Sequence, residues 1–212
     1  MFAGGLDRMI MDAPLEKYDD SELLKQYQQG NASAFKEIVN RYKNPLYAFL
    51  RRFLNRHDLV EDVFQETFLQ LYTSRETFDL KRPLQPWLFT IAANKAKDAL
   101  RKQQRNTMDM GAITDSTEAS IDDVVNILTS YKTTPDEEVS KNETAQRIRE
   151  IIANMPENLR SILILAYFEQ FSYKQMAEIL SIPIGTVKSR LHTAVVYFTK
   201  KWEAANRSDK NE

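Results

Sequence analysis

Residues 173–191 read Tyr173-Lys-Gln-Met-Ala-Glu-Ile-Leu-Ser-Ile-Pro-Ile-Gly-Thr-Val-Lys-Ser-Arg-Leu191, and this stretch decides the fold. Its apolar positions match two short helices that cross through a tight turn, which is the pattern of a helix-turn-helix. Pro183 stops the first helix, and Thr186 can cap the second helix or lie in its first turn. Ala177 is small enough to let the two helices approach each other. The other apolar positions are expected to close a small core: Met176, Leu180, Ile182, Val187 and Leu191.

The second helix of this motif predicts a DNA-reading face. At about 100° per residue, Val187, Leu191 and Ala194 point inward, and the polar residues between them point outward. A recognition helix in a major groove needs small or hydrogen-bonding side chains for base edges, and cations for the flanking phosphates. A merely solvated helix face is the alternative interpretation. The predicted DNA-binding residues of this helix are Thr186, Lys188, Ser189, Arg190, His192 and Thr193.

Helical apolar periodicity continues on both sides of the motif. The block from Val139 to Trp202 has room for four helices, and another block lies between Asp20 and Arg105. No alternating strand pattern of useful length occurs, and the chain has only five glycines. The sequence therefore predicts an all-α protein.

Two local signals in the first block predict helix starts. Ser33 can cap a helix whose inner face runs from Phe35 to Tyr42. Pro45 stands one turn into the next apolar run, and the missing donor of proline costs least near a helix start. We therefore expect one helix to begin at Ser33 and another near Pro45.

Charge changes sign along the chain, although the net charge is only −1. Residues 81–105 hold seven basic side chains and one acid, whereas residues 106–141 hold eight acids and two lysines. We interpret the acidic stretch as a flexible linker between two small helical domains. The expected segments are a disordered N-terminal segment at 1–19, a first domain at 20–105, the linker at 106–138, a second domain at 139–203 and a tail at 204–212.

The composition of the 212 residues excludes several classes of protein. No apolar stretch approaches the roughly 18 residues that suggest a membrane span. The N-terminus lacks the pattern of a secretory signal, so we expect a cytoplasmic protein. Cysteine is absent, which excludes disulfides and thiolate metal sites. His57 and His192 are the only histidines, and no zinc or phosphate-binding motif occurs, so we expect no catalytic residue, no metal and no cofactor.

Three motifs resemble one family. Residues 171–192, together with Met155-Pro and Arg160, closely resemble region four of the extracytoplasmic-function sigma factors, and the Gly-Thr-Val-Lys-Ser-Arg-Leu string is their most specific part. Residues 61–72 are similar to the region-two helix that docks on the largest subunit of RNA polymerase. Residues 87–94 are similar to the part that melts promoter DNA and reads the upstream edge of the bubble. The motifs occur in the family's order and cover most of the chain.

This resemblance implies an RNA polymerase sigma factor that binds core polymerase and directs promoter-specific initiation. Core RNA polymerase and promoter DNA are the implied partners, and an anti-sigma factor is left open as a third. The first domain would read the minus-ten element of the promoter and the second domain the minus-thirty-five element. Relatives often carry arginines after the position of His192, where this chain has Thr193, and a glycine at the position of Ser181.

The resemblance also implies site residues in the first domain. Asn94 would help to hold a base flipped from the non-template strand, and the loop Leu80–Pro86 would complete its pocket. Trp87 is interpreted as a core residue rather than as a base-stacking one. The implied phosphate contacts are Lys95, Lys97, Arg101, Lys102 and Arg105. The polymerase-binding residues are Asp62, Gln65, Glu66, Phe68 and Leu69, and all of these except Phe68 also share one face at helical spacing.

A stand-alone helix-turn-helix regulator is the main alternative. It would explain only the C-terminal third of the chain, and a receiver domain would need strands that the N-terminal half does not show. An enzyme is the second alternative, and the missing motifs count against it. A test of binding to core polymerase would distinguish a sigma factor from a free-standing regulator, because the regulator acts on DNA without the polymerase.

Overall fold

The computed structural model describes residues 14–104, 128 and 143–208, and within them every regular element is a helix. The all-α prediction is therefore confirmed for this part of the chain. Most of the expected linker, together with Arg105, lies outside the described residues. The elements in chain order are η2 (Leu15–Lys17), α1 (Asp20–Gln28), α2 (Ala32–Leu54), α3 (His57–Thr73), α4 (Leu84–Gln104), α6 (Glu143–Ala153), α7 (Glu157–Tyr167), α8 (Tyr173–Leu180) and α9 (Ile184–Ser208).

Helices α1 to α4 form the N-terminal module around a core of aromatic side chains. Phe49 and Phe53 of α2 stack with their ring centroids 5.7 Å apart, and Phe89 of α4 lies 5.3 Å from Phe49. All three side chains are fully buried. Trp87 packs edge-on against Phe78 at 4.8 Å, which agrees with its interpretation as a core residue.

Helix α2 differs from the sequence prediction at two points. It runs unbroken from Ala32 to Leu54 with Pro45 inside it, so the expected helix start near Pro45 is wrong. Proline removes only one backbone donor, whereas the buried stripe that includes Tyr42 and Leu46 continues across it. The helix is capped by Asn31 and not by Ser33, because the Asn31 side chain accepts a hydrogen bond of 3.0 Å from the Ser33 N–H.

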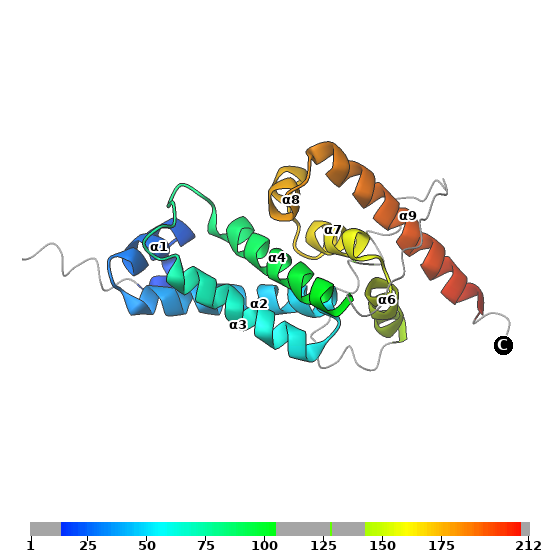
Figure 1. The fold of residues 1–212 in the computed structure, drawn as a ribbon, viewed down its shortest axis with the longest axis horizontal. Helices are drawn as coiled ribbons and strands as arrows, with labels where there is room; N and C mark the ends of the chain where they lie inside the picture. The colour runs from blue at the N-terminus through cyan, green and yellow to red at the C-terminus, as the bar shows by residue number, and fades with distance from the viewer. Residues whose placement is uncertain (1–13, 105–127, 129–142, 209–212) are drawn as a thin grey trace, which may run out of the picture.

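Helices α6 to α9 form the C-terminal module, which contains the four helices predicted there. The helix-turn-helix core is closed by Met176, Ile179 and Val187, none of which is exposed to solvent. Helix α9 runs to Ser208, which places part of the expected tail in a helix. Figure 1 shows α9 as the longest element of this module, extending away from α8.

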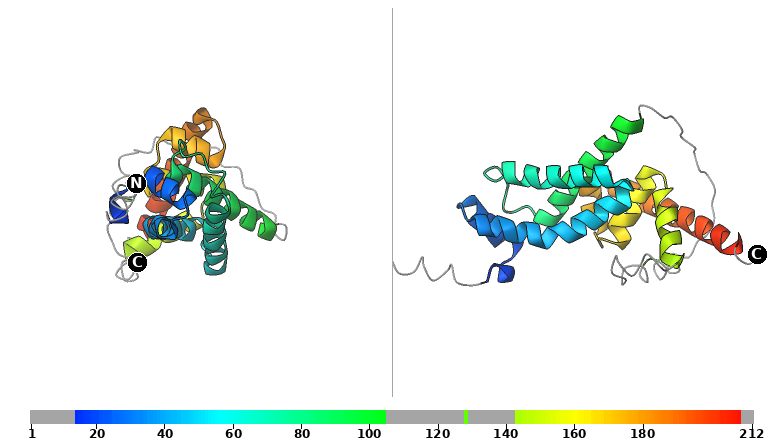
Figure 2. Two further views of the ribbon diagram at one scale, coloured as in Figure 1. Left: turned by 90° about the vertical axis from the view of Figure 1, so that its left-hand side faces the viewer. Right: turned by 90° about the horizontal axis from the view of Figure 1, so that it is seen from below.

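The two modules pack against each other along one surface, which we call the seam. The views in Figure 1 and Figure 2 agree that α4 lies beside α8 and that the end of α2 meets α6 and α7. Phe89 of α4 contacts the ring of Phe171 edge-on at 5.0 Å. Arg52 of α2 forms a 3.8 Å ion pair with Glu169 and lies 4.5 Å from the ring centroid of Phe168. We refer to this packing as the closed arrangement.

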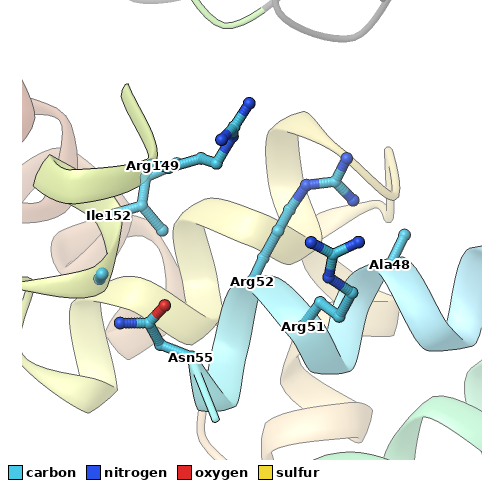
Figure 3. A pocket seen from close by; sticks show the side chains of 7 residues that line it. Ala48, Arg51, Arg52, Asn55, Arg149 and Ile152 are labelled. Carbon is cyan, nitrogen blue, oxygen red and sulfur yellow. The ribbon is translucent and has the colours of Figure 1, made fainter. Parts of the chain in front are cut away.

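A basic pocket opens at the end of the seam. Arg51 and Arg52 of α2 line it on one side together with Asn55, the residue that caps this helix, and Arg149 and Ile152 of α6 line it on the other (Figure 3). Apolar contacts and the ion pair between Arg52 and Glu169 therefore join the modules, whereas the pocket has arginines on both sides of the seam.

Candidate nucleic-acid interface

Helix α9 presents the predicted reading face to solvent. Lys188, Ser189, His192 and Thr193 are exposed. The inward positions of the same helix are buried as the sequence predicted, namely Val187, Leu191 and Ala194. Thr186 and Arg190 are partly buried at the edges of the face.

The two hydroxyl groups on this face are held in place by the helix itself. Ser189 Oγ donates to the Thr186 carbonyl at 3.2 Å, and Thr193 Oγ1 donates to the Ser189 carbonyl at 3.0 Å. Each hydroxyl oxygen keeps lone pairs that point away from the helix. The face can therefore accept hydrogen bonds from base amino groups while Lys188 lies beside it as a cation.

Local capping fixes the orientation of the first helix of the motif. Ser172 caps α8 in a reciprocal capping box, with the Gln175 backbone N–H bonded to Ser172 Oγ at 3.3 Å and the Ser172 N–H bonded to Gln175 Oε1 at 2.9 Å. Ser181 ends α8 in the left-handed conformation, with φ 54° and ψ 48°. A glycine would adopt this conformation with less strain, because a side chain is strained at positive φ.

Helix α4 carries the predicted DNA contacts of the first domain in three different environments. Asn94 and Lys102 are exposed. Arg101 pairs with Asp98 one turn earlier, at 3.5 Å. Lys95 donates a 2.9 Å hydrogen bond to Glu66 of α3, so a predicted DNA contact and a predicted polymerase contact neutralise each other here.

Lys97 shows that the two predicted DNA readers lie close together. Burial lowers the pKa of Lys97, the Glu157 carboxylate opposes this effect, and the guanidinium groups of Arg101 and Arg190 lower the pKa further. Because Arg190 belongs to the recognition helix and Lys97 to α4, the closed arrangement brings like charges from the two readers together.

A groove lies beside the loop that was expected to form a base pocket. Residues 80–86 form one wall, although the loop itself ends at Pro83 because α4 already begins at Leu84. Residues of α1 and α2 form the other wall, and the groove has a volume of about 610 Å³. Asn94 is not among the described residues that line the groove, so the structure does not bring it together with the loop. Gln175 of α8 lines the groove from the other module.

Sequence reasoning missed the second wall of this groove. Asp20 accepts a hydrogen bond of 2.6 Å from Arg41 and another from the Tyr42 hydroxyl. Burial and the hydrogen bond to Asp20 raise the pKa of Tyr42. These residues lie on different helices about twenty positions apart, and no spacing rule on one helix could have joined them.

The acidic face of α3 is exposed, with one correction. Asp62, Gln65, Glu66 and Leu69 lie at the surface as predicted from their spacing. Phe68 is a core residue instead: it is only 9% exposed, and its ring lies 5.1 Å from that of Phe64. Its position falls on the inner stripe of α3, which faces the rest of the module. Tyr72, which the sequence reasoning did not select, is exposed one turn beyond Leu69.

Comparisons with known proteins match both modules. The family model for sigma-70 region 2 matches residues 38–106, and that for sigma-70 region 4 matches residues 145–196. The chain is 35% identical to an ECF RNA polymerase sigma-E factor of Haemophilus influenzae over 84% of this chain and 93% of that protein. It is 32% identical to the ECF RNA polymerase sigma factor SigW of Bacillus subtilis over 80% of this chain and 89% of SigW.

Two solved structures share the fold. CnrH, solved in complex with the cytosolic domain of CnrY, superposes with a TM-score of 0.63 at 22% identity, covering 87% of this chain and 97% of CnrH. The sigma factor RpoE, solved with the anti-sigma factor NepR from Bartonella quintana, gives a TM-score of 0.58 at 24% identity, covering 80% of this chain and 96% of RpoE.

Neither a metal site nor a membrane-spanning helix occurs in the described part of the chain. No cluster of three or more histidine, aspartate or glutamate side chains has the arrangement of a metal site there. None of the helices described has the length and apolar character that a bilayer crossing requires.

Proposed function

The chain belongs to the extracytoplasmic-function subfamily of the sigma-70 factors, and from this premise we propose which of its surfaces bind core RNA polymerase and which read the promoter. A sigma factor binds the core enzyme and directs promoter-specific initiation of transcription, and this is the function of the chain. The observation that carries the residue assignment is the exposed polar face of α9 above a buried helix-turn-helix core. We retain 20–105 and 139–203 as the two functional modules.

The polymerase-binding surface of the proposal is the exposed face of α3. It combines the carboxylates of Asp62 and Glu66 with the apolar side chains of Leu69 and Tyr72. Acidic groups steer the chain to a basic partner surface, and exposed apolar side chains contribute affinity once they are buried. Phe68 supports this face from the core and is not proposed as a contact.

The minus-thirty-five reader of the proposal is the N-terminal half of α9. Ser189, His192 and Thr193 would contact base edges, and Lys188 and Arg190 would contact the flanking phosphates. Thr186, in the first turn of the helix, would position the sugar-phosphate backbone. Because Thr193 occupies a position where relatives carry arginine, fewer phosphate contacts are expected here, and hence a smaller salt dependence.

The minus-ten reader of the proposal combines α4 with the groove beside Leu80–Pro86. Asn94 and the loop would receive the flipped base, and cations of α4 would hold the phosphates. Since Asn94 does not line the groove in the closed arrangement, the base would have to bridge the two. The proposed phosphate contacts are Lys95, Lys97, Arg101, Lys102 and Arg105.

Promoter recognition requires the modules to separate. Elements about 25 base pairs apart, as their names state, lie about 85 Å apart along B-DNA at 3.4 Å per base pair. In the closed arrangement, Arg190 is near enough to Lys97 for its guanidinium charge to lower the pKa of Lys97. The two readers cannot then engage both elements at once, so we infer that binding to core polymerase opens the seam.

Paired variants test the division of labour between α3 and α9. Leu69→Ala with Asp62→Asn should lower the affinity for core polymerase and leave the preferred promoter sequence unchanged. Ser189→Ala with Lys188→Ala should preserve binding to core polymerase and weaken promoter-specific transcription. The assignment is overturned if the α3 variant changes promoter choice, or if the α9 variant loses core binding. Binding to immobilised core enzyme and run-off transcription measure the two effects separately.

RpoE, which shares the fold, was solved with an anti-sigma factor, and we propose that a regulator of that class also binds this chain. Mixing the purified chain with candidate anti-sigma factors would test it. No catalytic residue is assigned, because sigma factors are initiation factors without enzymatic activity of their own. We propose that the chain acts in the cytoplasm, because a partner of core polymerase acts where the genome is transcribed.

A further inference from the structure

The large exposed apolar side chains of the described residues fall into two pairs. Leu69 and Tyr72, each 60% exposed, belong to the α3 face proposed for polymerase binding. Tyr173 and Ile184 are 46% and 45% exposed, and they are the first residues of α8 and α9. The second pair has no role in the surfaces assigned above.

Tyr173 and Ile184 belong to one continuous surface. Lys188 Nζ lies 6.0 Å from the ring centroid of Tyr173, and Lys188 stands one turn after Ile184 on α9. Lys188 is also exposed and lies on the proposed DNA-reading face. We call Tyr173, Ile184 and Lys188 the leading-edge patch, because it stands where the recognition helix begins.

The glycine that follows Ile184 has no explanation inside the protein. A Cβ built at Gly185 would meet nothing within 4 Å, and its φ is not positive. Glycine inside a helix is less stable than alanine, so this residue weakens α9 without serving the packing of the chain. A partner whose backbone approaches the first turn of α9 closely would explain why no side chain stands there.

The partner is identified by the chemistry of the major groove. The N-terminal residues of a recognition helix point at base edges, and Ile184 is the first residue of such a helix. An isoleucine cannot hydrogen-bond, and the only apolar group on the major-groove edges of the four bases is the 5-methyl group of thymine. The exposed Ile184 therefore suits a thymine, with Lys188 placed for a neighbouring phosphate.

We propose that Ile184 is a specificity residue that reads the methyl group of a thymine in the upstream promoter element, and that Gly185 lets the DNA backbone approach. This inference rests on the proposed function, in which α9 enters the major groove of that element. It adds an apolar contact to a reading face that otherwise consists of polar and charged groups. The upstream element should consequently contain a thymine whose replacement is costly.

Replacing thymine by uracil removes only the methyl group and tests the contact. The test uses the full chain with core polymerase and a promoter selected from a library with a randomised upstream element. Each thymine of that element is replaced in turn, and binding is measured against the unmodified duplex. For the natural chain, one position should show about a fourfold loss of affinity, the value for exposing one methyl-sized group.

Substitutions of Ile184 and Gly185 complete the test. In Ile184→Ala the ratio of the affinities for the thymine and the uracil duplex at that position should fall to one. In Ile184→Val part of the difference between the two affinities should remain. The ratio compares two DNAs with one protein, so a general loss of affinity cancels. Gly185→Ala should weaken binding to every sequence without lowering the melting temperature.

Three results would overturn the inference. The first is that no thymine of the upstream element loses affinity when it is replaced by uracil. The second is that the ratio of the affinities for the thymine and the uracil duplex stays above one in Ile184→Ala. The third is that Gly185→Ala binds promoter DNA as tightly as the natural chain. If the natural chain with core polymerase selects no promoter at all, the proposed function itself fails, and that outcome is distinct from the loss of methyl dependence.

Discussion

The ion pair between Arg52 and Glu169 offers a quantitative test of the closed arrangement. The Glu169 side chain is 7% exposed and that of Arg52 is 24% exposed, with 3.8 Å between nitrogen and oxygen. At that distance, Coulomb attraction is worth about 1 kcal/mol in water and about 4 kcal/mol at an effective dielectric constant of 20. Desolvation of the two groups offsets part of this attraction. We expect a net coupling of about 2 kcal/mol.

A double-mutant cycle measures this coupling directly. The variants are Arg52→Met, Glu169→Gln and the double substitution, and the observable is the free energy of unfolding in urea. Arg52→Met also removes the contact with Phe168, but that loss is present in both arms of the cycle and cancels. A coupling below about 0.5 kcal/mol would contradict the closed arrangement, which is the state from which we infer that the modules separate. The coupling should also shrink in high salt, because part of it is electrostatic.

Three other substitutions give independent predictions. Ser181→Gly should raise the free energy of unfolding of the C-terminal module by about 1 kcal/mol in urea titrations, because it relieves the left-handed strain at φ 54°; an unchanged midpoint would count against the observed turn. Tyr42→Phe should lower stability by about 1.5 kcal/mol at neutral pH by removing the hydrogen bond to Asp20. Because the folded pKa of Tyr42 is raised, the stability it contributes is lost as pH rises above its unfolded value of about 10, so the difference from the natural chain should narrow there. Lys97→Met should be more stable than the natural chain at pH 7, because burial lowers the pKa of Lys97. Its advantage should shrink as pH rises toward the unfolded lysine pKa of about 10.4, because over this range Lys97 loses its proton in the folded state before it does so in the unfolded state, which stabilises the natural chain; a constant difference across this range would show that Lys97 is not desolvated.

Local patterns predicted the helices well, because helix formation depends on residues three and four positions apart. The inward positions Val187, Leu191 and Ala194 are buried as the spacing required. The failures occurred where two local signals competed. Pro45 signals a helix start, but the apolar stripe around it continues, and burial of that stripe outweighs one missing hydrogen bond.

The candidate site was harder to predict, because it depends on contacts between helices. Spacing on α3 selected the exposed residues correctly, whereas the family likeness alone suggested Phe68, which the structure buries. The pairing of Lys95 with Glu66 and the approach of Arg190 to Lys97 join residues on different helices. No periodicity on one helix contains that information, and the seam was therefore not predicted at all.

Run-off transcription tests the central claim most directly. Purified chain and core RNA polymerase are incubated with a promoter library in which both the upstream and the downstream element are randomised, and the transcribed templates are sequenced. We predict two conserved sequence blocks at a fixed spacing, one lost in the Ser189→Ala and Lys188→Ala variant and the other retained. Transcription without sequence preference, or no transcription above that of core enzyme alone, would contradict the account.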